Sequence, residues 1–302
     1  MSVNEIFVPA TLVGLRTIDP GEIRTVAFAL PREYSVNGKS YPLQDQMRPG
    51  NAFLAKPFGA RTAKVRRRMY TRSNSSVDSK LTLETIINHT HAAKADTSIW
   101  WQSKEVEALQ REGGTVDIRV AWSQDRTHLL VYENSLDCKP ANLRLEPDDQ
   151  WPHMRFLAIA LSTGITPFLA HVRYMATFNF GRTPNHPGCR YTLIASHRNH
   201  RQLMEHEELL ALERQFPDHF RYFPVLTREW PTGWPYGKGR IVRVKEGTDD
   251  DPQIDVGPLL EIIPDVEQCH VRMCGNAIAR NQLLKGLEQN GIEPPSFRSE
   301  VW

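Results

Sequence analysis

The segment Met154–Ala170, "MRFLAIALSTGITPFLA", decides the fold class. Its first eight residues, 154–161, are mostly apolar, which is typical of a strand that is buried on both faces. The apolar run ends at Ser162 and the chain turns through Gly164. Pro167 then stands near the first position of a helix, where the missing N–H of proline costs nothing. This succession of strand, turn and helix predicts one unit of a parallel α/β sheet.

The same alternation continues to the end of the chain. The apolar segments that we expect to be strands are 154–161, 190–196, 221–226, 269–275 and 296–302. The segments between them that have helical patterns are 166–178, 201–216, 254–263 and 277–291. Five apolar strands separated by helices predict a five-stranded parallel sheet that is covered by helices on both faces.

The N-terminal half has a different pattern, with many short strand-like segments. These segments are 24–31, 47–55, 64–73, 80–91, 114–122 and 127–134. Asn37-Gly38 is a strong signal for a tight hairpin turn. One helix is expected at 97–114, with Ser98 as its N-terminal cap and Gly113-Gly114 as its stop. Short strands with a single helix predict a small antiparallel β-barrel.

The length of 302 residues suits two domains, each with its own core. A polar segment with several prolines, 139–152, separates the two patterns and reads as a linker. We therefore expect a barrel domain at 1–148 and an α/β domain at 149–302. The net charge of +2 and the ordinary content of charged residues, 24%, give no reason to expect a nucleic-acid or membrane partner.

The sequence also bears on location and on metals. The N-terminus has no basic region before a long apolar run, and the most apolar segment is too short to cross a bilayer, so a cytoplasmic protein is expected. The four cysteines are scattered, and free thiols are favoured over disulfides. The histidine pairs His89/His91 and His197/His200 have no acidic or thiol neighbours at ligand spacing, so no metal site is predicted.

Three short segments carry candidate chemistry, although each alone also fits a purely structural role. Ser162–Pro167 opens a helix, where free backbone N–H groups favour an anion such as a pyrophosphate. Arg68 and Tyr70 lie on one side of an expected strand, and Lys64 and Arg66 share that side, which would give a phosphate-binding face beside an aromatic ring. Cys274-Gly275 ends an expected strand at the edge where parallel sheets bind ligands.

Taken in order, these motifs resemble the ferredoxin–NADP reductase family. The resemblance rests on Arg-x-Tyr-Thr at 68–71, Thr-Gly-Ile-x-Pro at 163–167, Cys274-Gly275 and the terminal Glu300-Val301-Trp302. It covers nearly the whole chain in the family's order and spacing. It implies that the barrel binds FAD and that the α/β domain binds NADP(H).

The resemblance implies specific contacts to FAD. Arg68 would pair with the pyrophosphate, Tyr70 would stack on one face of the isoalloxazine ring, and Thr71 would lie close to flavin N5. The family usually has serine at the position of Thr71. Ser98 resembles the family's second pyrophosphate contact, although Ala95 stands where the family has a glycine.

Similar contacts to NADP(H) are implied. The loop that contains Thr163, Gly164 and Pro167 resembles the one that accepts the NADP pyrophosphate. Thr227 and Arg228 resemble the pair that holds the 2′-phosphate, and an arginine suits a dianion that NADH lacks. The segment 230–239 departs from the family, and the roles of its Tyr236 and Lys238 stay open.

The end of the chain completes the implied site. Cys274 and Gly275 would lie beside the nicotinamide, and Glu300 would hydrogen-bond near Thr71 and assist proton transfer. Trp302 resembles the terminal aromatic residue, usually tyrosine, that covers the flavin until the nicotinamide displaces it. Thr71, Cys274, Glu300 and Trp302 are therefore the expected catalytic residues.

The implied function is hydride transfer between NADPH and FAD, with single electrons passed to or from a separate ferredoxin or flavodoxin. The basic segment 61–68 is a candidate docking surface for that carrier, in competition with a role at the FAD phosphates. Two alternatives remain open. One is a reductase subunit that serves a single oxygenase, and the other is a FAD-bearing subunit with little turnover of its own.

Overall fold

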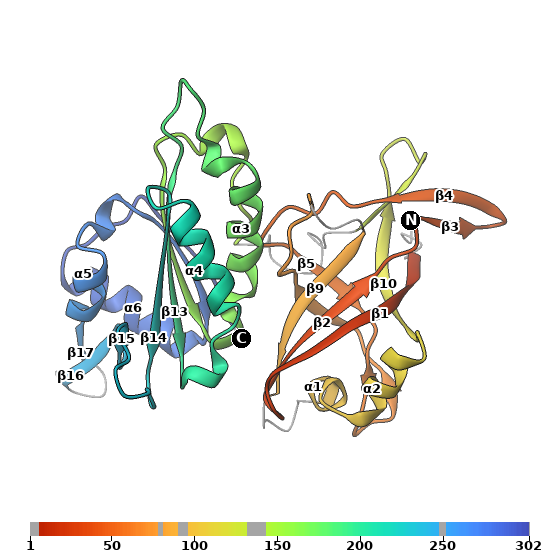
Figure 1. The fold of residues 1–302 in the computed structure, drawn as a ribbon, viewed down its shortest axis with the longest axis horizontal. Helices are drawn as coiled ribbons and strands as arrows, with labels where there is room; N and C mark the ends of the chain where they lie inside the picture. The colour runs from red at the N-terminus through yellow and green to blue at the C-terminus, as the bar shows by residue number, and fades with distance from the viewer. Residues whose placement is uncertain (1–5, 78–80, 90–95, 132–142, 248–251, 302) are drawn as a thin grey trace. The chain divides into compact units, whose positions relative to one another are not determined.

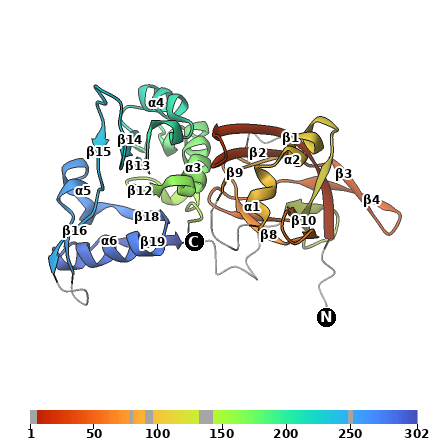
Figure 2. The same cartoon turned by 90° about the horizontal axis from the view of Figure 1, so that it is seen from below.

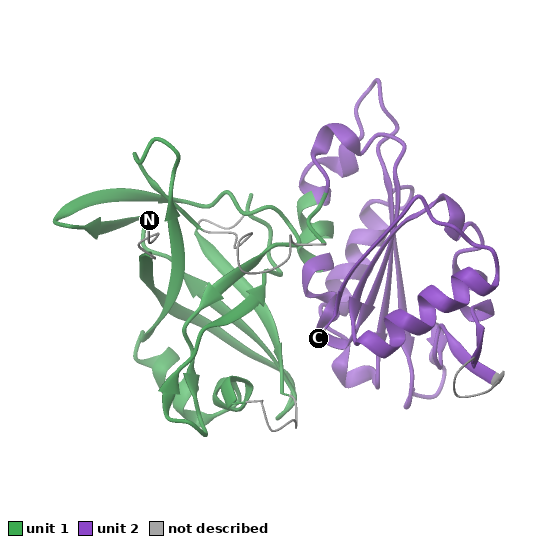
Figure 3. Cartoon of the chain, turned by 180° about the vertical axis from the view of Figure 1, so that it is seen from behind, with its two compact units in different colours: residues 1–145, 169–174 green, residues 146–168, 175–302 purple. Residues whose placement is uncertain are grey.

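The computed structural model describes residues 6–77, 81–89, 96–131, 143–247 and 252–301. Figure 1 shows the course of the chain. It forms two compact units, residues 1–145 with 169–174 (unit 1) and residues 146–168 with 175–302 (unit 2), which are coloured separately in Figure 3.

Unit 1 is built on a mostly antiparallel sheet that curves into a half-barrel, as predicted. The strands run in the order β3-β4-β11-β10-β1-β2-β9, and β5 pairs with both β10 and β8. Their bounds are β1 Ile6–Asp19, β2 Ile23–Ala29, β3 Glu33–Val36, β4 Lys39–Gln44, β5 Ala52–Ala55, β8 Arg68–Thr71, β9 Thr82–Asn88, β10 Thr115–Trp122 and β11 Leu129–Val131. The core of the half-barrel includes Phe28, Phe53, Trp101 and Ile118, all fully buried.

The expected hairpin turn is present between β3 and β4. Val36 pairs with Lys39, and the two residues between them have positive φ, 52° at Asn37 and 79° at Gly38. These angles explain why asparagine and glycine occupy the turn.

The sequence patterns did not reveal β1, the longest strand of the unit. It pairs with β10 over Ile6–Thr11 and with β2 from Thr11 onward, and its register shifts between Leu12 and Gly14. The irregularity disturbs the two-residue alternation on which strand prediction depends.

Two expected elements of unit 1 are each divided in the structure. The segment 64–73 forms β7 (Lys64–Val65), which pairs with β6 (Phe58–Gly59), and then the separate strand β8. The segment 97–114 forms α1 (Asp96–Trp101) and α2 (Lys104–Arg111). The expected cap at Ser98 is therefore wrong, because α1 already begins at Asp96. Ser103 is the observed cap of α2, where its hydroxyl accepts a hydrogen bond from Val106 N at 3.4 Å.

Unit 2 contains the predicted parallel sheet with helices. The described strands run in the order β15-β14-β13-β12-β18-β19, and their bounds are β12 Arg155–Leu161, β13 Arg190–His197, β14 Phe220–Leu226, β15 Gly237–Lys238, β18 His270–Gly275 and β19 Ser296–Val301. All five expected strands are present. The sixth, β15, has two residues and was not expected.

Helices cover both faces of this sheet, with α3 and α4 on one side and α5 and α6 on the other (Figure 2). Their bounds are α3 Thr166–Thr177, α4 His206–Gln215, α5 Gly257–Ile262 and α6 Ala277–Gln289. A short antiparallel ribbon, β16 (Arg243–Gly247) with β17 (Pro252–Asp255), packs beside α6. The core under α5 and α6 includes Leu157, Ile159, Val271, Leu259 and Leu283, all fully or almost fully buried.

A buried ion pair holds the first residue of unit 2 against the sheet. The Arg272 side chain on β18 is 1% exposed and is paired with Glu146. The carboxylate of Glu146 also lies 3.3 Å from Arg298 on β19, and its backbone oxygen accepts a hydrogen bond from Trp151 at 2.9 Å. The chain therefore enters unit 2 through a contact that is charged and shielded from water.

Candidate active site

The predicted nucleotide-binding residues of unit 2 lie at one edge of the sheet. Because the strands are parallel, the carboxyl ends of β14, β12, β18 and β19 meet at the same edge. The residues at these strand ends are, in the same order, Thr227-Arg228, the 162–167 loop, Cys274 and Glu300. Open parallel sheets bind their ligands at this edge.

The 162–167 loop forms a tight turn before α3. Ser162 has a positive φ of 52°, residues 162–165 form one 3₁₀ turn, and Pro167 stands in the first turn of α3 as expected. The hydroxyl of Thr166 donates a hydrogen bond to Thr163 O at 2.6 Å, which stabilises the turn. Gly164 and Pro167 are buried whereas Thr163 is half-buried, so a ligand can reach Thr163 and the other two residues shape the loop.

Thr227 and Arg228 follow β14 and are fixed by the neighbouring strand. Thr227 donates hydrogen bonds to His197 O from its backbone N at 2.8 Å and from its Oγ1 at 3.1 Å, and Arg228 N donates to Arg198 O at 3.0 Å. The Arg228 side chain is exposed. A fixed backbone with an exposed guanidinium is suited to recognising an anion.

The 230–239 segment brings another cation to the same place. Its β15 pairs with β14 so that Lys238 stands opposite Leu226, the residue before Thr227. Lys238 is exposed, and Tyr236 is half-buried with its ring 5.0 Å from that of Trp234. Lys238 therefore lies beside the expected phosphate-binding pair, whereas the ring of Tyr236 packs against Trp234 and His206.

Cys274 and Glu300 are direct partners in the register of β18 and β19. Burial, and secondarily the neighbouring Glu300 carboxylate, raise the pKa of the Cys274 thiol well above its usual range. Burial raises the pKa of Glu300 to about 7. The thiol therefore stays protonated, and the carboxyl group can take up or release a proton near neutral pH.

Gly275 allows the end of β18 to approach β12 closely. A Cβ atom at this position would lie 2.8 Å from Leu161 Cβ and 2.7 Å from its Cδ1. Any larger residue would separate Cys274 from the 162–167 loop, so glycine is needed here for packing.

In unit 1, β8 carries Arg68, Tyr70 and Thr71. Their partners on the neighbouring strand β5 are Ala55, Phe53 and Ala52, in that order. Arg68 and Tyr70 share a side of the strand, as expected, and all three side chains are half-buried. Among the residues that the structure describes, Arg68 has no carboxylate partner, and its Nη1 donates only to Arg67 O at 3.0 Å. An arginine without an acidic partner is available for a phosphate group.

Helix α1 holds the hydroxyl of Tyr70. Trp101 Nε1 donates a hydrogen bond to Tyr70 Oη at 2.8 Å, and the two rings meet edge to face with centroids 6.2 Å apart. Burial raises the pKa of Tyr70 to about 12, so the phenol stays protonated. Tyr70 is therefore held in place by Trp101, a residue that the sequence analysis did not single out; an aromatic pair in a short helix was its only signal.

The expected face of Lys64, Arg66, Arg68 and Tyr70 is wrong in one respect. Arg66 and Arg67 lie between β7 and β8, and Arg66 Nε is 3.6 Å from a carboxylate oxygen of Asp96. Arg66 thus has an acidic partner within the protein, unlike Arg68. Asp96 was also not expected, because nothing in the sequence places it near residues 59–66.

Ser98 lies in the interior of the short helix α1, two residues after Asp96. Trp302, the expected lid over the flavin, lies outside the described residues, so its predicted role rests on the sequence. His91 also falls outside them.

In the described ranges, no group of three or more acidic, histidine or cysteine residues could hold a metal ion. None of the helices in the described segments is both long and apolar enough to span a membrane.

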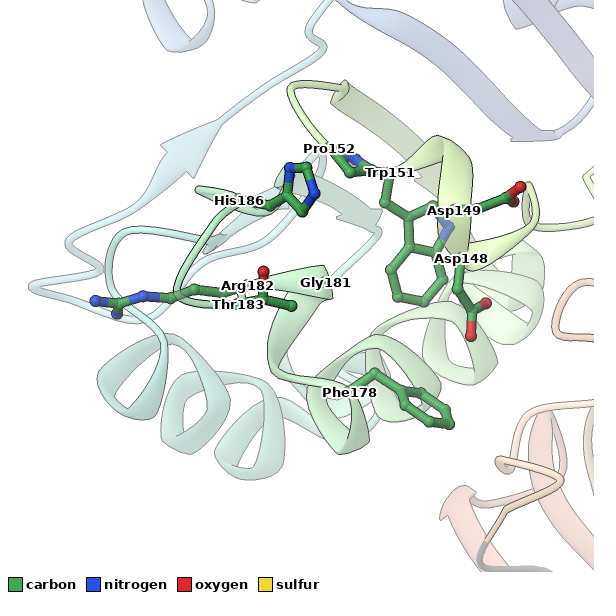
Figure 4. A pocket seen from close by; sticks show the side chains of 9 residues that line it. All are labelled: Asp148, Asp149, Trp151, Pro152, Phe178, Gly181, Arg182, Thr183 and His186. Atoms are coloured by element: carbon green, nitrogen blue, oxygen red, sulfur yellow. The ribbon is translucent and has the colours of Figure 1, made fainter.

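Unit 2 also has an open pocket of about 440 Å³ away from the sheet's carboxyl edge (Figure 4). It lies between the segment before β12 and the segment before β13, and Asp149, Trp151, Phe178 and His186 are among its lining residues. Trp151 is fully buried, and its indole N–H donates a hydrogen bond to Glu146 O. The pocket contains none of the predicted site residues.

Residues 159–281 match a family model described as the oxidoreductase NAD-binding domain. The matched segment begins in β12 and includes the 162–167 loop, Arg228 and Cys274. This part of the chain is therefore an oxidoreductase NAD-binding domain. The match supports the resemblance that was drawn from the motifs, and no curated protein matches the sequence.

Solved structures share the fold of this chain over its whole length. A ferredoxin NADP⁺ reductase from Neisseria gonorrhoeae with bound FAD and NADP is 16% identical, with 98% of each chain covered and a TM-score of 0.57. The Amycolatopsis cytochrome P450 reductase GcoB is 16% identical, with 100% of this chain and 71% of that chain covered and a TM-score of 0.63. The cytochrome b5 reductase domain of Ulva prolifera nitrate reductase is 16% identical, with 98% and 97% covered and a TM-score of 0.60. At these identities the comparison shows a common fold.

Proposed function

We propose that this protein transfers hydride between NADPH and FAD and exchanges single electrons with a separate carrier protein. The observation that carries the proposal is the order of the candidate groups along the carboxyl edge of the unit 2 sheet. An exposed arginine follows β14, a tight turn into a helix follows β12, and a thiol and a carboxyl group end β18 and β19.

This order suits an extended dinucleotide laid across the edge. Strands are spaced about 4.8 Å apart, so β14 and β18 are roughly 14 Å apart across β13 and β12. The 2′-phosphate would lie by Arg228 and Lys238, the pyrophosphate by Thr163, and the nicotinamide by Cys274. Thr227 would contribute less than Arg228, because its hydroxyl proton is already donated to His197 O.

The barrel domain, for which the sequence predicts residues 1–148, would hold FAD, and the α/β domain, predicted at 149–302, would hold NADP(H). Arg68 and Ser98 would bind the pyrophosphate, Tyr70 would support the isoalloxazine ring, and Thr71 would face its reactive edge. FAD supplies the chemistry by taking a hydride as an electron pair and giving up electrons singly. The protein supplies orientation. Because Trp101 already holds Tyr70 in one position, the Tyr70 side chain loses little conformational entropy when a planar ring binds against it.

The remaining catalytic assignments concern Cys274, Glu300 and Trp302. Cys274 is buried and protonated, so it would pack against the nicotinamide and would not act as a nucleophile. Glu300 would exchange a proton with solvent near neutral pH. Trp302 would cover the flavin until the nicotinamide enters.

Ferredoxin or flavodoxin is the proposed carrier, docked at the basic segment 61–68, in which Lys64 is exposed and Val65 is 61% exposed. A reductase dedicated to one oxygenase is the second candidate. It is favoured by structural neighbours that include a cytochrome P450 reductase and the ferredoxin reductase of carbazole 1,9a-dioxygenase. A cytoplasmic location remains a prediction from the sequence.

The test is anaerobic titration of the purified protein. We expect a yellow protein that is bleached by NADPH in the absence of any carrier and reoxidised by ferredoxin or flavodoxin. A colourless protein that binds no added FAD would refute the proposal. Bleaching followed by reoxidation with only one oxygenase component would select the second candidate, and FAD binding without bleaching would indicate a subunit with little turnover.

A further inference from the structure

The carboxylate of Asp96, at the start of α1, is surrounded by donors from the hairpin of β6 and β7. Its Oδ1 accepts hydrogen bonds from the backbone N of Arg61 at 2.6 Å and of Thr62 at 3.3 Å. Its Oδ2 accepts one from Thr62 Oγ1 at 2.5 Å and lies 3.6 Å from Arg66 Nε. Asp96 is only 7% exposed, so these contacts join the hairpin to α1 where water has little access.

Gly59 makes this close contact possible. A Cβ atom at position 59 would lie 2.2 Å from Asp96 Oδ2 and 2.7 Å from Thr62 Oγ1. Its φ is not in the left-handed region, so the glycine is needed for space alone. The hairpin and the carboxylate therefore fit each other specifically.

The elements joined by Asp96 are those that carry the proposed FAD contacts. Ser98 is two residues further along α1, and Trp101 at the end of α1 binds the Tyr70 hydroxyl at 2.8 Å. The hairpin continues directly into β8, which begins at Arg68. The position of Asp96 thus sets the position of Ser98 relative to Arg68.

The charge of Asp96 is also matched within the protein. A bare carboxylate beside a pyrophosphate would repel it. Here the Thr62 hydroxyl, the two backbone N–H groups and Arg66 compensate the charge and hold the pKa of Asp96 below its usual value. Arg66 is therefore used internally, and Arg68 is left for the ligand.

We propose that Asp96 is a positioning residue for FAD, which locks the β6–β7 hairpin to α1 so that Arg68 and Ser98 are set to grip one pyrophosphate. The inference rests on the proposed function of unit 1. Asp96 does not touch the cofactor; it acts through Thr62 and through the two elements that it joins.

Variants at Thr62 test the inference with little risk to folding, because this residue is exposed. Thr62→Val removes the hydroxyl donor at constant shape, and Thr62→Ser retains it. We expect T62V to raise the Kd of the apoprotein for FAD about tenfold and T62S to restore it to within about twofold, as for a hydrogen bond to a charged group. Asp96→Asn should raise the Kd further, by roughly a hundredfold.

The matched control is Glu33→Gln, which removes another carboxylate of unit 1, one that accepts a hydrogen bond from Ser40 Oγ at 2.9 Å in the separate hairpin of β3 and β4. It should leave the FAD Kd unchanged, and all four variants should bind NADP⁺ as the unaltered protein does. The FAD Kd is read from quenching of flavin fluorescence, and the melting temperature of each apoprotein is measured in parallel.

The outcomes separate the inference from the proposed function. If the unaltered protein binds FAD and both T62V and D96N bind it equally well, the inference fails and the proposed function stands. If T62V weakens FAD and T62S does not restore it, the hydroxyl–carboxylate contact is not the cause, and the inference also fails. If the unaltered apoprotein binds no FAD, the proposed function fails and the inference fails with it.

Discussion

Cys274 and Glu300 face each other across two adjacent parallel strands, at the edge where the sheet ends. Cys274 is buried and Glu300 is half-buried, and burial is the main cause of the raised pKa in each. The pair thus combines a thiol that stays neutral with a carboxyl group that changes charge near pH 7.

Replacing Glu300 by Gln should remove a pH-dependent step from the reaction. The pKa of Glu300 is about 7, so the group is protonated below this pH and charged above it. We expect the rate of flavin reduction by NADPH to change between pH 6 and 8 in the unaltered protein and to be flat, and about 10- to 100-fold lower, in E300Q. Stopped-flow absorbance across this range measures it. Exposed Glu293, replaced in the same way, is the control, and an unchanged profile in E300Q would exclude the proton-transfer role.

The same carboxyl group should affect stability in a direction that can be worked out. Its folded pKa of about 7 exceeds its ordinary value of 4.5, so between these values the folded state holds the proton more tightly than the unfolded state. The contribution of Glu300 to the free energy of unfolding therefore falls as pH rises from 4.5 to 7 and is constant outside that window. Chemical denaturation should show E300Q more stable than the unaltered protein at pH 8, by on the order of 2 kcal/mol, relative to any difference at pH 4. The opposite sign would show that the charged form is stabilised.

Arg228→Ala should change the preference between the two coenzymes. The exposed guanidinium is proposed to contact a 2′-phosphate that NADH lacks. We expect KM for NADPH to rise about 10- to 100-fold and KM for NADH to change less than about twofold, since a charge-assisted contact contributes roughly 1.5–3 kcal/mol. Arg214→Ala, on α4, is the control. Equal losses for both coenzymes would refute the assignment.

Tyr70→Phe should separate stability from cofactor binding. Removing the hydroxyl leaves Trp101 Nε1 buried without its acceptor, which should lower the free energy of unfolding by about 1–3 kcal/mol. The aromatic ring remains, so FAD should still bind with a similar Kd. Urea denaturation and flavin titration measure the two effects. Tyr70→Leu serves as the comparison, because it should lower the free energy of unfolding and also weaken FAD binding.

Glu146→Gln should destabilise unit 2 strongly. It leaves Arg272, whose side chain is 1% exposed, without its buried counter-charge, at a cost of about 3–5 kcal/mol. The double variant with Met at both positions should recover much of this loss, because apolar groups need no partner. Differential scanning calorimetry of both variants is the measurement. A single variant as stable as the unaltered protein would mean that water or the amide oxygen of the introduced glutamine satisfies Arg272.

The elements predicted correctly have strong local patterns. Strands β12, β13, β14 and β18 of unit 2 are mostly buried and appear as apolar runs. Asn37-Gly38 fixes its turn by its own backbone preference. Elements that depend on distant partners were missed. Strand β1 has an irregular register, and the two-residue β15 exists only because Gly237 and Lys238 meet the edge of β14.

The candidate site shows the same division. The 162–167 loop, Arg228 and Cys274 were found because each follows or ends an apolar strand. Glu300 was found only through the resemblance of the terminal segment to the reductase family. Asp96 could not be found in this way, because its partners Arg61 and Thr62 are more than 30 residues away in a hairpin with no strong pattern. The break at Ser103 was also unpredictable, since both Ser98 and Ser103 suit a helix cap.

Helix α3 begins in unit 2, yet its residues 169–174 group with unit 1. In unit 1, His171 Nε2 donates to Leu143 O at 2.7 Å, and Arg173 Nη1 contacts Ser73 O and Glu84, both at 3.0 Å. An isolated N-terminal fragment that stops at the linker would lack these donors and leave the three acceptors to solvent. Anyone who wishes to study the half-barrel apart from the rest of the chain should therefore supply the missing turn of helix, for instance as an added peptide or a grafted segment.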